Sequence, residues 1–133
     1  MISSILSHIS ALVLFVAGLV LLFASDTVLP AILPGFPATG AWLGQLLAAA
    51  WLGVAASTWL QRRAVLGGIY GRPTVFANLA LYFISALSLL RVVLGHGAPT
   101  VLWFAVAVTG VLAVAYGALL LHGPFGAAER SAP

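Results

Sequence analysis

The chain has 133 residues, of which 63% are hydrophobic and only 5% are charged. So few charged residues cannot cover a surface that faces water, and the composition therefore indicates a protein whose solvent is lipid. Five arginines against two acidic residues give a formal net charge of +3, too few basic residues to suggest a nucleic-acid partner. The sequence contains no cysteine, which excludes disulfides, thiolate metal sites and thiol redox chemistry.

Four apolar segments, at residues 5–24, 40–60, 74–94 and 100–121, dominate the sequence. Each has about the 20 residues that a helix needs to cross a bilayer. We therefore predict an all-α polytopic membrane protein, a bundle of four transmembrane helices. Residues 1–122 are expected to form a single four-helix transmembrane domain, and residues 123–133 a flexible cytoplasmic tail.

The first segment is expected to be a retained helix rather than a secretory signal, because its first ten residues carry no Arg or Lys and its apolar run is long. At 100° per residue, one sector of this helix is predicted to face protein. It holds Ser4, Ser7, His8, Ala11, Phe15, Gly18, Ser25 and Asp26. His8 and Asp26 lie about 27 Å apart along the helix axis, so they belong to opposite membrane ends.

The connection at residues 25–39 contains Pro30, Pro34 and Pro37, with Gly35 between the last two. These prolines predict that no continuous helix runs through it. The connection is nevertheless apolar, which indicates a segment that lies in the interface or against the bundle mouth. It is either a plain connector or a lid over a cavity that opens outward.

Helix two carries small residues every fourth position on two faces. The first face has Gly40, Gly44 and Ala48, and the second has Ala49, Gly53 and Ser57. Such spacing lets a neighbouring helix approach closely, so one face is expected to pack within the bundle and the other against a second subunit. Gly110, Ala113 and Gly117 give helix four a similar strip.

Orientation is predicted from the loop between helices two and three. Arg62, Arg63 and Arg72 lie there without an acidic residue, which is typical of a cytoplasmic loop. Both termini are then cytoplasmic, an N-in/C-in topology. Trp42, Trp59, Tyr70 and Trp103 fall near helix ends, as expected for rings in the headgroup layer.

Polar residues within the apolar segments are the candidates for function. Helix three has a stripe of Asn78, Tyr82 and Ser85 that starts on the inner side. At the outer end, Asp26 and Arg91 are predicted at the same depth, where an ion pair would form a structural latch. The alternatives are an anion site on Arg91, or an Arg91 that extends to the headgroups without meeting Asp26.

The inner end is predicted to gather eight polar or charged residues, namely His8, Gln61, Arg62, Arg63, Tyr70, Arg72, Asn78 and His122. A pair of histidines can ligate haem or a divalent ion, but no metal-binding or catalytic motif accompanies this one. We therefore assign no metal, cofactor or catalytic residue. The glycine-rich loop at residues 67–73 is either a tight turn or a cradle for a phosphate headgroup.

The helix from Gly44 to Arg63, with its small residues and terminal Trp59, together with the loop that leads to Asn78, resembles a group of short four-helix bacterial inner-membrane proteins of unknown function. The resemblance implies a multi-pass protein of the bacterial inner (cytoplasmic) membrane and no particular activity. Small multidrug exporters and fluoride channels do not fit, because Asp26 lies at the end of the first segment and the channel patterns are missing.

The expected function is an integral membrane subunit, homo-oligomeric or accessory to a larger membrane complex, that binds lipid or a small hydrophobic molecule. One alternative is a small-molecule or ion transporter or channel, with a hydrated cavity lined by the helix-one sector and the helix-three stripe. The other is a cofactor-dependent membrane enzyme acting on a hydrophobic substrate. The candidate ligand-binding residues are Asp26, Arg91, His8, Asn78, Tyr82, Ser85, Arg72 and His122.

Overall fold

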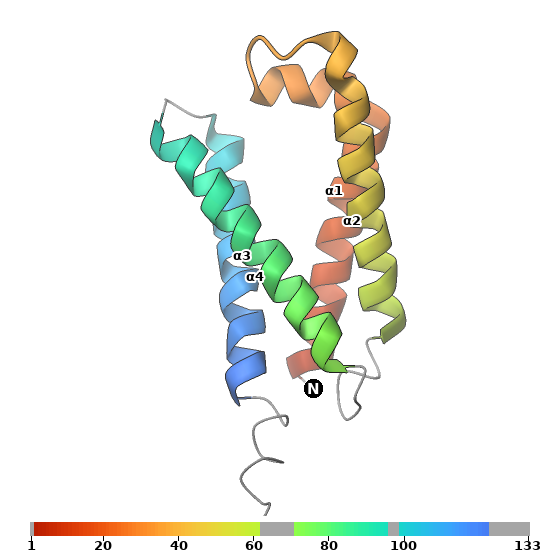
Figure 1. Ribbon diagram of the computed structural model, residues 1–133, viewed down its shortest axis with the longest axis vertical. Coiled ribbons are helices and arrows are strands. Elements are labelled where there is room, and N and C mark those ends of the chain that lie inside the picture. Colours follow the sequence, from red (N-terminus) through yellow and green to blue (C-terminus); the bar gives the residue numbers. More distant parts are fainter. Residues whose placement is uncertain (1, 62–70, 96–98, 123–133) are drawn as a thin grey trace, which may run out of the picture. The chain divides into compact units, whose positions relative to one another are not determined.

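The computed structural model describes residues 2–61, 71–95 and 99–122, and this part of the chain is helical without a β-strand (Figure 1). The elements are α1 (Ile2–Ile32), the 3-10 turn η1 (Ala38–Gly40), α2 (Ala41–Leu60), α3 (Gly71–Gly95) and α4 (Thr100–His122). The predicted all-α class is confirmed. The loop at residues 62–70, the turn around His96 and the tail at 123–133 lie outside the described residues.

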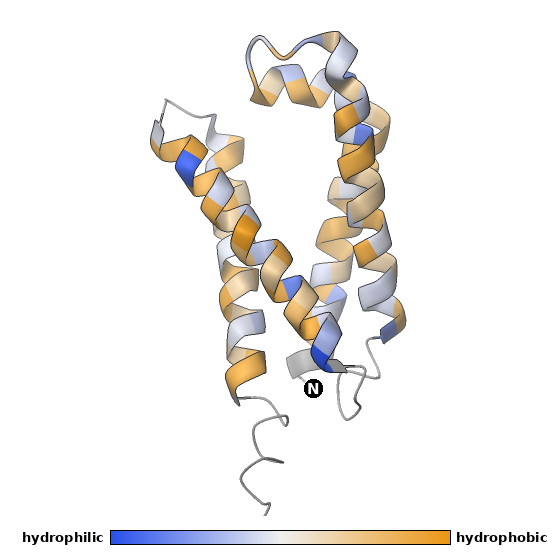
Figure 2. Ribbon diagram, in the orientation of Figure 1, coloured by the Kyte–Doolittle hydropathy of each residue, from blue (hydrophilic) through white to orange (hydrophobic). Residues whose placement is uncertain are grey.

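All four α-helices are long and apolar enough to cross a membrane. The candidate spans are Ser4–Ile32, Ala38–Leu60, Arg72–Gly95 and Thr100–Leu121. Figure 2 shows hydrophobic residues along each of them, with hydrophilic residues at only a few positions. The chain thus has the character of a membrane protein, while the N-in/C-in topology stays a prediction.

Two compact units make up the chain. One contains α1 from Ser7 onward, η1 and α2, and the other contains α3 and α4 with Gln61 and the first residues of α1. Each unit is a pair of helices joined by a short connection. The single four-helix domain expected for residues 1–122 stays a prediction.

Helix α1 does not end at residue 24, as the sequence had suggested, but bends there and continues to Ile32. Ala24 has a non-helical backbone (φ −127°, ψ 25°), and Pro30 lies inside the helical turns that follow. Pro30 has no N–H to donate to the carbonyl of Asp26, and its ring crowds that carbonyl, which disturbs the turn that follows Ala24. The helix ends at Ile32, so no continuous helix runs through the whole connection at residues 25–39. In the turn that follows, Gly35 has a φ of +88°, which favours glycine.

Helices α1 and α2 approach closely through glycines. A Cβ atom at Gly44 would lie 2.9 Å from Cδ1 of Leu29 and 3.1 Å from Cβ of Ser25. A Cβ atom at Gly18 would lie 2.9 Å from Cγ of Leu52. The close packing predicted for the first small-residue face of α2 is therefore confirmed at Gly44.

The two other predicted strips of small residues differ. Ala49, Gly53 and Ser57 are exposed, and a Cβ atom at Gly53 would meet no atom within 4 Å. On α4, a Cβ atom at Gly117 would contact Leu79 of α3 at 3.7 Å, whereas Gly110 faces open space. The second face of α2 is thus left uncovered by α1 within the α1–α2 unit.

The buried side of α1 is rotated from the predicted one. Ser7, Ala11, Gly18 and Ser25 are buried as expected, but Phe15 and Asp26 are exposed. Ser10, Leu14 and Leu21, which the predicted sector omitted, are buried instead. At 100° per residue the two sectors differ by roughly 60°. The error arose because leucine carries no signal for the protein-facing side of a helix that lies in lipid.

Candidate functional site

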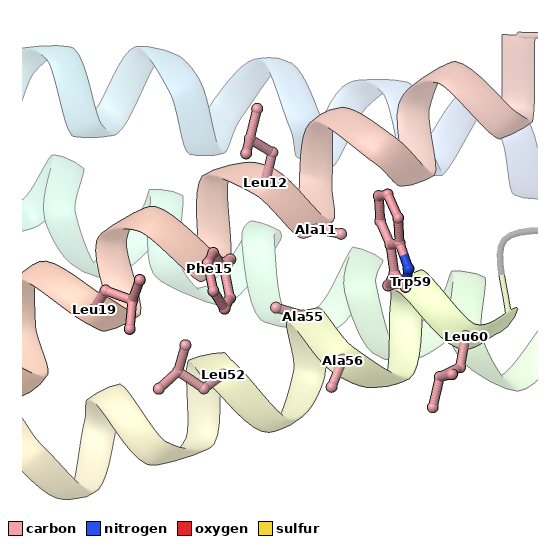
Figure 3. A pocket seen from close by; sticks show the side chains of 9 residues that line it. All are labelled: Ala11, Leu12, Phe15, Leu19, Leu52, Ala55, Ala56, Trp59 and Leu60. Carbon is pink, nitrogen blue, oxygen red and sulfur yellow. The ribbon is translucent and has the colours of Figure 1, made fainter.

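An apolar groove lies between α1 and α2, with a volume of about 600 Å³. Figure 3 shows Phe15 and Trp59 projecting from the two helices, each toward the facing helix. Apart from the indole nitrogen of Trp59, the side chains around the groove contain only carbon and hydrogen. They are Ala11, Leu12, Phe15 and Leu19 from α1, and Leu52, Ala55, Ala56, Trp59 and Leu60 from α2.

The groove arises from a mismatch of side-chain size along the two helices. Ala11 and Ala55 are 4% and 2% exposed, so they form a buried floor with little volume of its own. Large side chains such as Leu12 and Leu60 are mostly exposed and form the rim. Small residues on the floor beside large residues on the rim leave a channel that is open at the protein surface.

The groove is about as long as one leaflet is thick. Its walls run from Ala11 to Leu19 on α1 and from Leu52 to Leu60 on α2. Eight steps of 1.5 Å along a helix correspond to about 12 Å. Half of the hydrocarbon core of a bilayer measures about 15 Å. Because Leu60 is the last residue of α2, the groove begins at a helix end and extends toward mid-helix.

Polar groups mark one end of this groove. The rings of His8 and Trp59 lie 5.1 Å apart at an interplanar angle of 78°, an edge-to-face contact. His8 is half-buried and Trp59 is 47% exposed. Figure 3 shows the indole nitrogen of Trp59 on the side of its ring toward Leu60 and the helix end. Among the predicted site residues whose side chains the structure describes, His8 is the one that contacts a residue of the groove, Trp59.

The predicted stripe on α3 is packed inside the α3–α4 unit. Asn78 and Tyr82 are 1% and 2% exposed, while Ser85 is half-buried. Asn78 Nδ2 donates a hydrogen bond of 2.9 Å to the carbonyl of Thr74 in its own helix. The ring of Tyr82 stacks on Tyr116 of α4, with centroids 5.8 Å apart and planes 17° apart. These contacts give Asn78 and Tyr82 a place in helix packing.

Tyr116 was missed by sequence reasoning, although it is 1% exposed and one of the largest buried side chains. It lies three residues after Ala113, one of the small residues already noted on α4, and both side chains are buried. Small residues let a neighbouring helix approach, and an aromatic ring beside them fills the remaining space. That combination was the signal that could have identified it.

Another polar contact of the α3–α4 unit lies at the start of α3. Thr74 Oγ1 donates a hydrogen bond to Oε1 of Gln61, the residue that follows α2 in the sequence. Within α4, Thr109 Oγ1 donates to the carbonyl of Ala105 at 2.7 Å. Both hydroxyls thereby satisfy their donors inside an apolar environment, where an unsatisfied donor is costly.

The charged candidates lie at the surface. Asp26, Arg72 and Arg91 are all exposed. Thr27 Oγ1 lies 3.5 Å from Oδ1 of Asp26, a long and weak contact. Asp26 belongs to the α1–α2 unit and Arg91 to the α3–α4 unit, so the latch between them stays a prediction. His122 is the last residue of α4, and its side chain lies outside the described residues.

Within the described ranges, no group of three or more His, Asp or Glu side chains is placed to hold a metal ion. No protein-family model matches the chain, and no curated protein or solved structure is significantly similar to it. The resemblance to short bacterial inner-membrane proteins therefore stays an expectation. Function has to be argued from the groove and its surroundings.

Proposed function

We propose that this chain is an integral membrane protein that binds a lipid or a small hydrophobic molecule in the α1–α2 groove. The observation that carries the proposal is the groove itself, with its apolar lining and its volume of about 600 Å³. Its rim residues Leu12 and Phe15 are exposed, so a molecule in the membrane can reach it directly.

The chemistry of the lining favours an apolar occupant. In hydrocarbon, association depends on close van der Waals contact, because the surrounding lipid is as apolar as leucine. The floor residues Ala11 and Ala55 allow such contact over the length of the groove. An ion or a strongly polar solute would find no ligand along this lining and would lose its hydration. The groove therefore supports binding of a hydrophobic molecule better than it supports an ion pathway.

The setting that we propose is the bacterial inner membrane, where the chain acts as a homo-oligomer or as an accessory subunit. The exposed face of Ala49, Gly53 and Ser57 on α2 supports contact with another transmembrane helix. This face adjoins the groove, because the groove residues Ala56 and Leu60 lie on the same side of α2 as Ala49 and Gly53. A partner helix on this face would therefore lie beside the rim of the groove.

The test compares the wild-type protein with Ala56→Leu, a variant that fills the groove from an exposed position. Protein purified in mild detergent is extracted with organic solvent, and the retained molecules are identified and counted by mass spectrometry. We expect a retained hydrophobic molecule in the wild type and a loss of it in Ala56→Leu. Ala50→Leu is the matched control, because Ala50 is exposed on α2 but does not line the groove. Equal retention by all three proteins would contradict the proposal.

A further inference from the structure

The groove has the length and the polarity of one membrane leaflet. From it we infer that the occupant is a bilayer phospholipid, held by one acyl chain with its headgroup at the His8–Trp59 end. This inference rests on the proposed function and adds the class of ligand, its orientation and its leaflet. It follows from the length, the lining and the one polar end of the groove.

The length of the groove indicates an acyl chain. It starts at Leu60, the last residue of α2, and reaches Leu52 and Leu19 about 12 Å further along. One leaflet of hydrocarbon is about 15 Å thick, so the groove covers most of the depth that an acyl chain occupies. A compact hydrophobic molecule would not need a channel that follows the helix axis from the membrane surface toward the midplane.

The polarity of the groove sets the orientation. At the end away from Trp59, where Phe15, Leu19 and Leu52 form the walls, only hydrocarbon side chains line the groove. His8 and the indole of Trp59 contact each other at the helix end. Trp favours the headgroup layer, where its ring is apolar and its N–H is hydrated. A molecule with one polar end and one long apolar tail matches this arrangement in a single direction.

The experiment uses brominated phosphatidylcholine as the probe, because bromine quenches tryptophan fluorescence at short range. The full chain is prepared with Trp59 as its only tryptophan, by exchanging Trp42, Trp51 and Trp103 for Phe. A second protein keeps only Trp42. The two residues are matched, since each lies one residue from an end of α2 and they are 47% and 56% exposed. Of these two tryptophans, Trp59 lines the groove and Trp42 does not.

Both proteins are reconstituted in vesicles of phosphatidylcholine that contain a small fraction of the brominated lipid. Bromine is placed either near the ester end or near the methyl end of the chain. We expect the bromolipid to quench Trp59 more than Trp42, and to quench Trp59 more strongly when bromine lies near the ester. Adding Ala56→Leu should remove the difference in quenching between Trp59 and Trp42. The Ala50→Leu variant should retain the excess.

The other outcomes separate the two proposals. Stronger quenching of Trp59 by bromine near the methyl end would overturn the orientation and leave hydrophobic binding intact. Equal quenching of Trp59 and Trp42, with an extracted molecule that still depends on Ala56, would overturn the phospholipid and leave the proposed function in place. Equal quenching without any extracted molecule would overturn both. Far-UV circular dichroism of the Ala56→Leu protein confirms that the variant is folded before either reading is made.

Discussion

Substitution of Gly44 by alanine tests the packing of α1 on α2 most directly. The added Cβ would lie 2.9 Å from Cδ1 of Leu29, 3.1 Å from Cβ of Ser25 and 3.4 Å from Cδ1 of Leu21. The Leu29 methyl group can rotate away, because it is the end of a flexible side chain. Cβ of Ser25 cannot, because it is bonded to the backbone of α1. The two helices must therefore separate by a few tenths of an ångström.

The expected cost follows from two opposing effects. Forcing one extra carbon into a well-packed contact costs about 1–3 kcal/mol. Exchanging glycine for alanine inside a helix stabilises that helix by about 1 kcal/mol. Gly53→Ala is the matched control, because it has the same helix-propensity gain and no atom within 4 Å of its new Cβ. The difference between the two variants isolates the packing cost, because the gain in helix propensity cancels, and we expect it to be about 1–3 kcal/mol in favour of Gly53→Ala.

The assay is reversible unfolding in mixed micelles with an increasing fraction of dodecyl sulfate, followed by far-UV circular dichroism. Gly44→Ala should unfold at a lower fraction of dodecyl sulfate than Gly53→Ala. The wild type should unfold below Gly53→Ala and at or above the fraction that unfolds Gly44→Ala. Equal free energies of unfolding for the two variants would refute the close approach of α1 and α2 at Gly44. Gly44→Leu against Gly53→Leu enlarges the same comparison, since leucine cannot fit where one carbon already collides.

Three further predictions concern the α3–α4 contact, the Asn78 hydrogen bond and the bend of α1. Exchanging Tyr82 and Tyr116 for Leu, singly and together, should give a coupling free energy of about 0.5–1.5 kcal/mol from their stacked rings; additive losses would contradict the stacking. Asn78→Ala should lower the free energy of unfolding by about 1–2 kcal/mol, because it removes a buried hydrogen bond, whereas the exposed Ser88→Ala should change it by less than about 0.5 kcal/mol. Pro30→Ala should straighten α1, measured as a longer distance between spin labels on either side of the bend; an unchanged distance would assign the bend to another cause.

The sequence predicted the helices well and the faces of the helices less well. Apolar length alone located all four helices, although α1 extends beyond the predicted residue 24, because a helix that is to cross a membrane must match its thickness. The small residue Gly44 predicted a close helix contact correctly, since few other uses of glycine occur inside an apolar helix. Phe15 and Asp26 of the predicted protein-facing sector are exposed, because polar and small residues had been used to mark that side and the leucines had not.

The groove could not be predicted from the sequence. Its walls depend on the register between α1 and α2. That register brings Ala11 near Trp59 and Phe15 near Ala55 (Figure 3). That register follows from the contacts of Gly18 and Gly44. The sequence predicted that Gly44 meets another helix, but not which residues of that helix it meets. Trp59 was assigned only to the headgroup layer, although its ring also closes one end of the groove.

The close contact and the groove share one physical cause. Lipid gives no hydrophobic driving force for helix association, so both depend on how well surfaces fit. At Gly44 and Gly18 the helices fit each other, and no room is left for a third molecule. Along the rim, beside the buried floor of Ala11 and Ala55, the side chains of the two helices leave the groove open, and this is the space that the proposed lipid would fill. The residue sizes that hold α1 against α2 at one end thus leave, at the other, a groove whose shape is what the proposed function relies on to select its occupant.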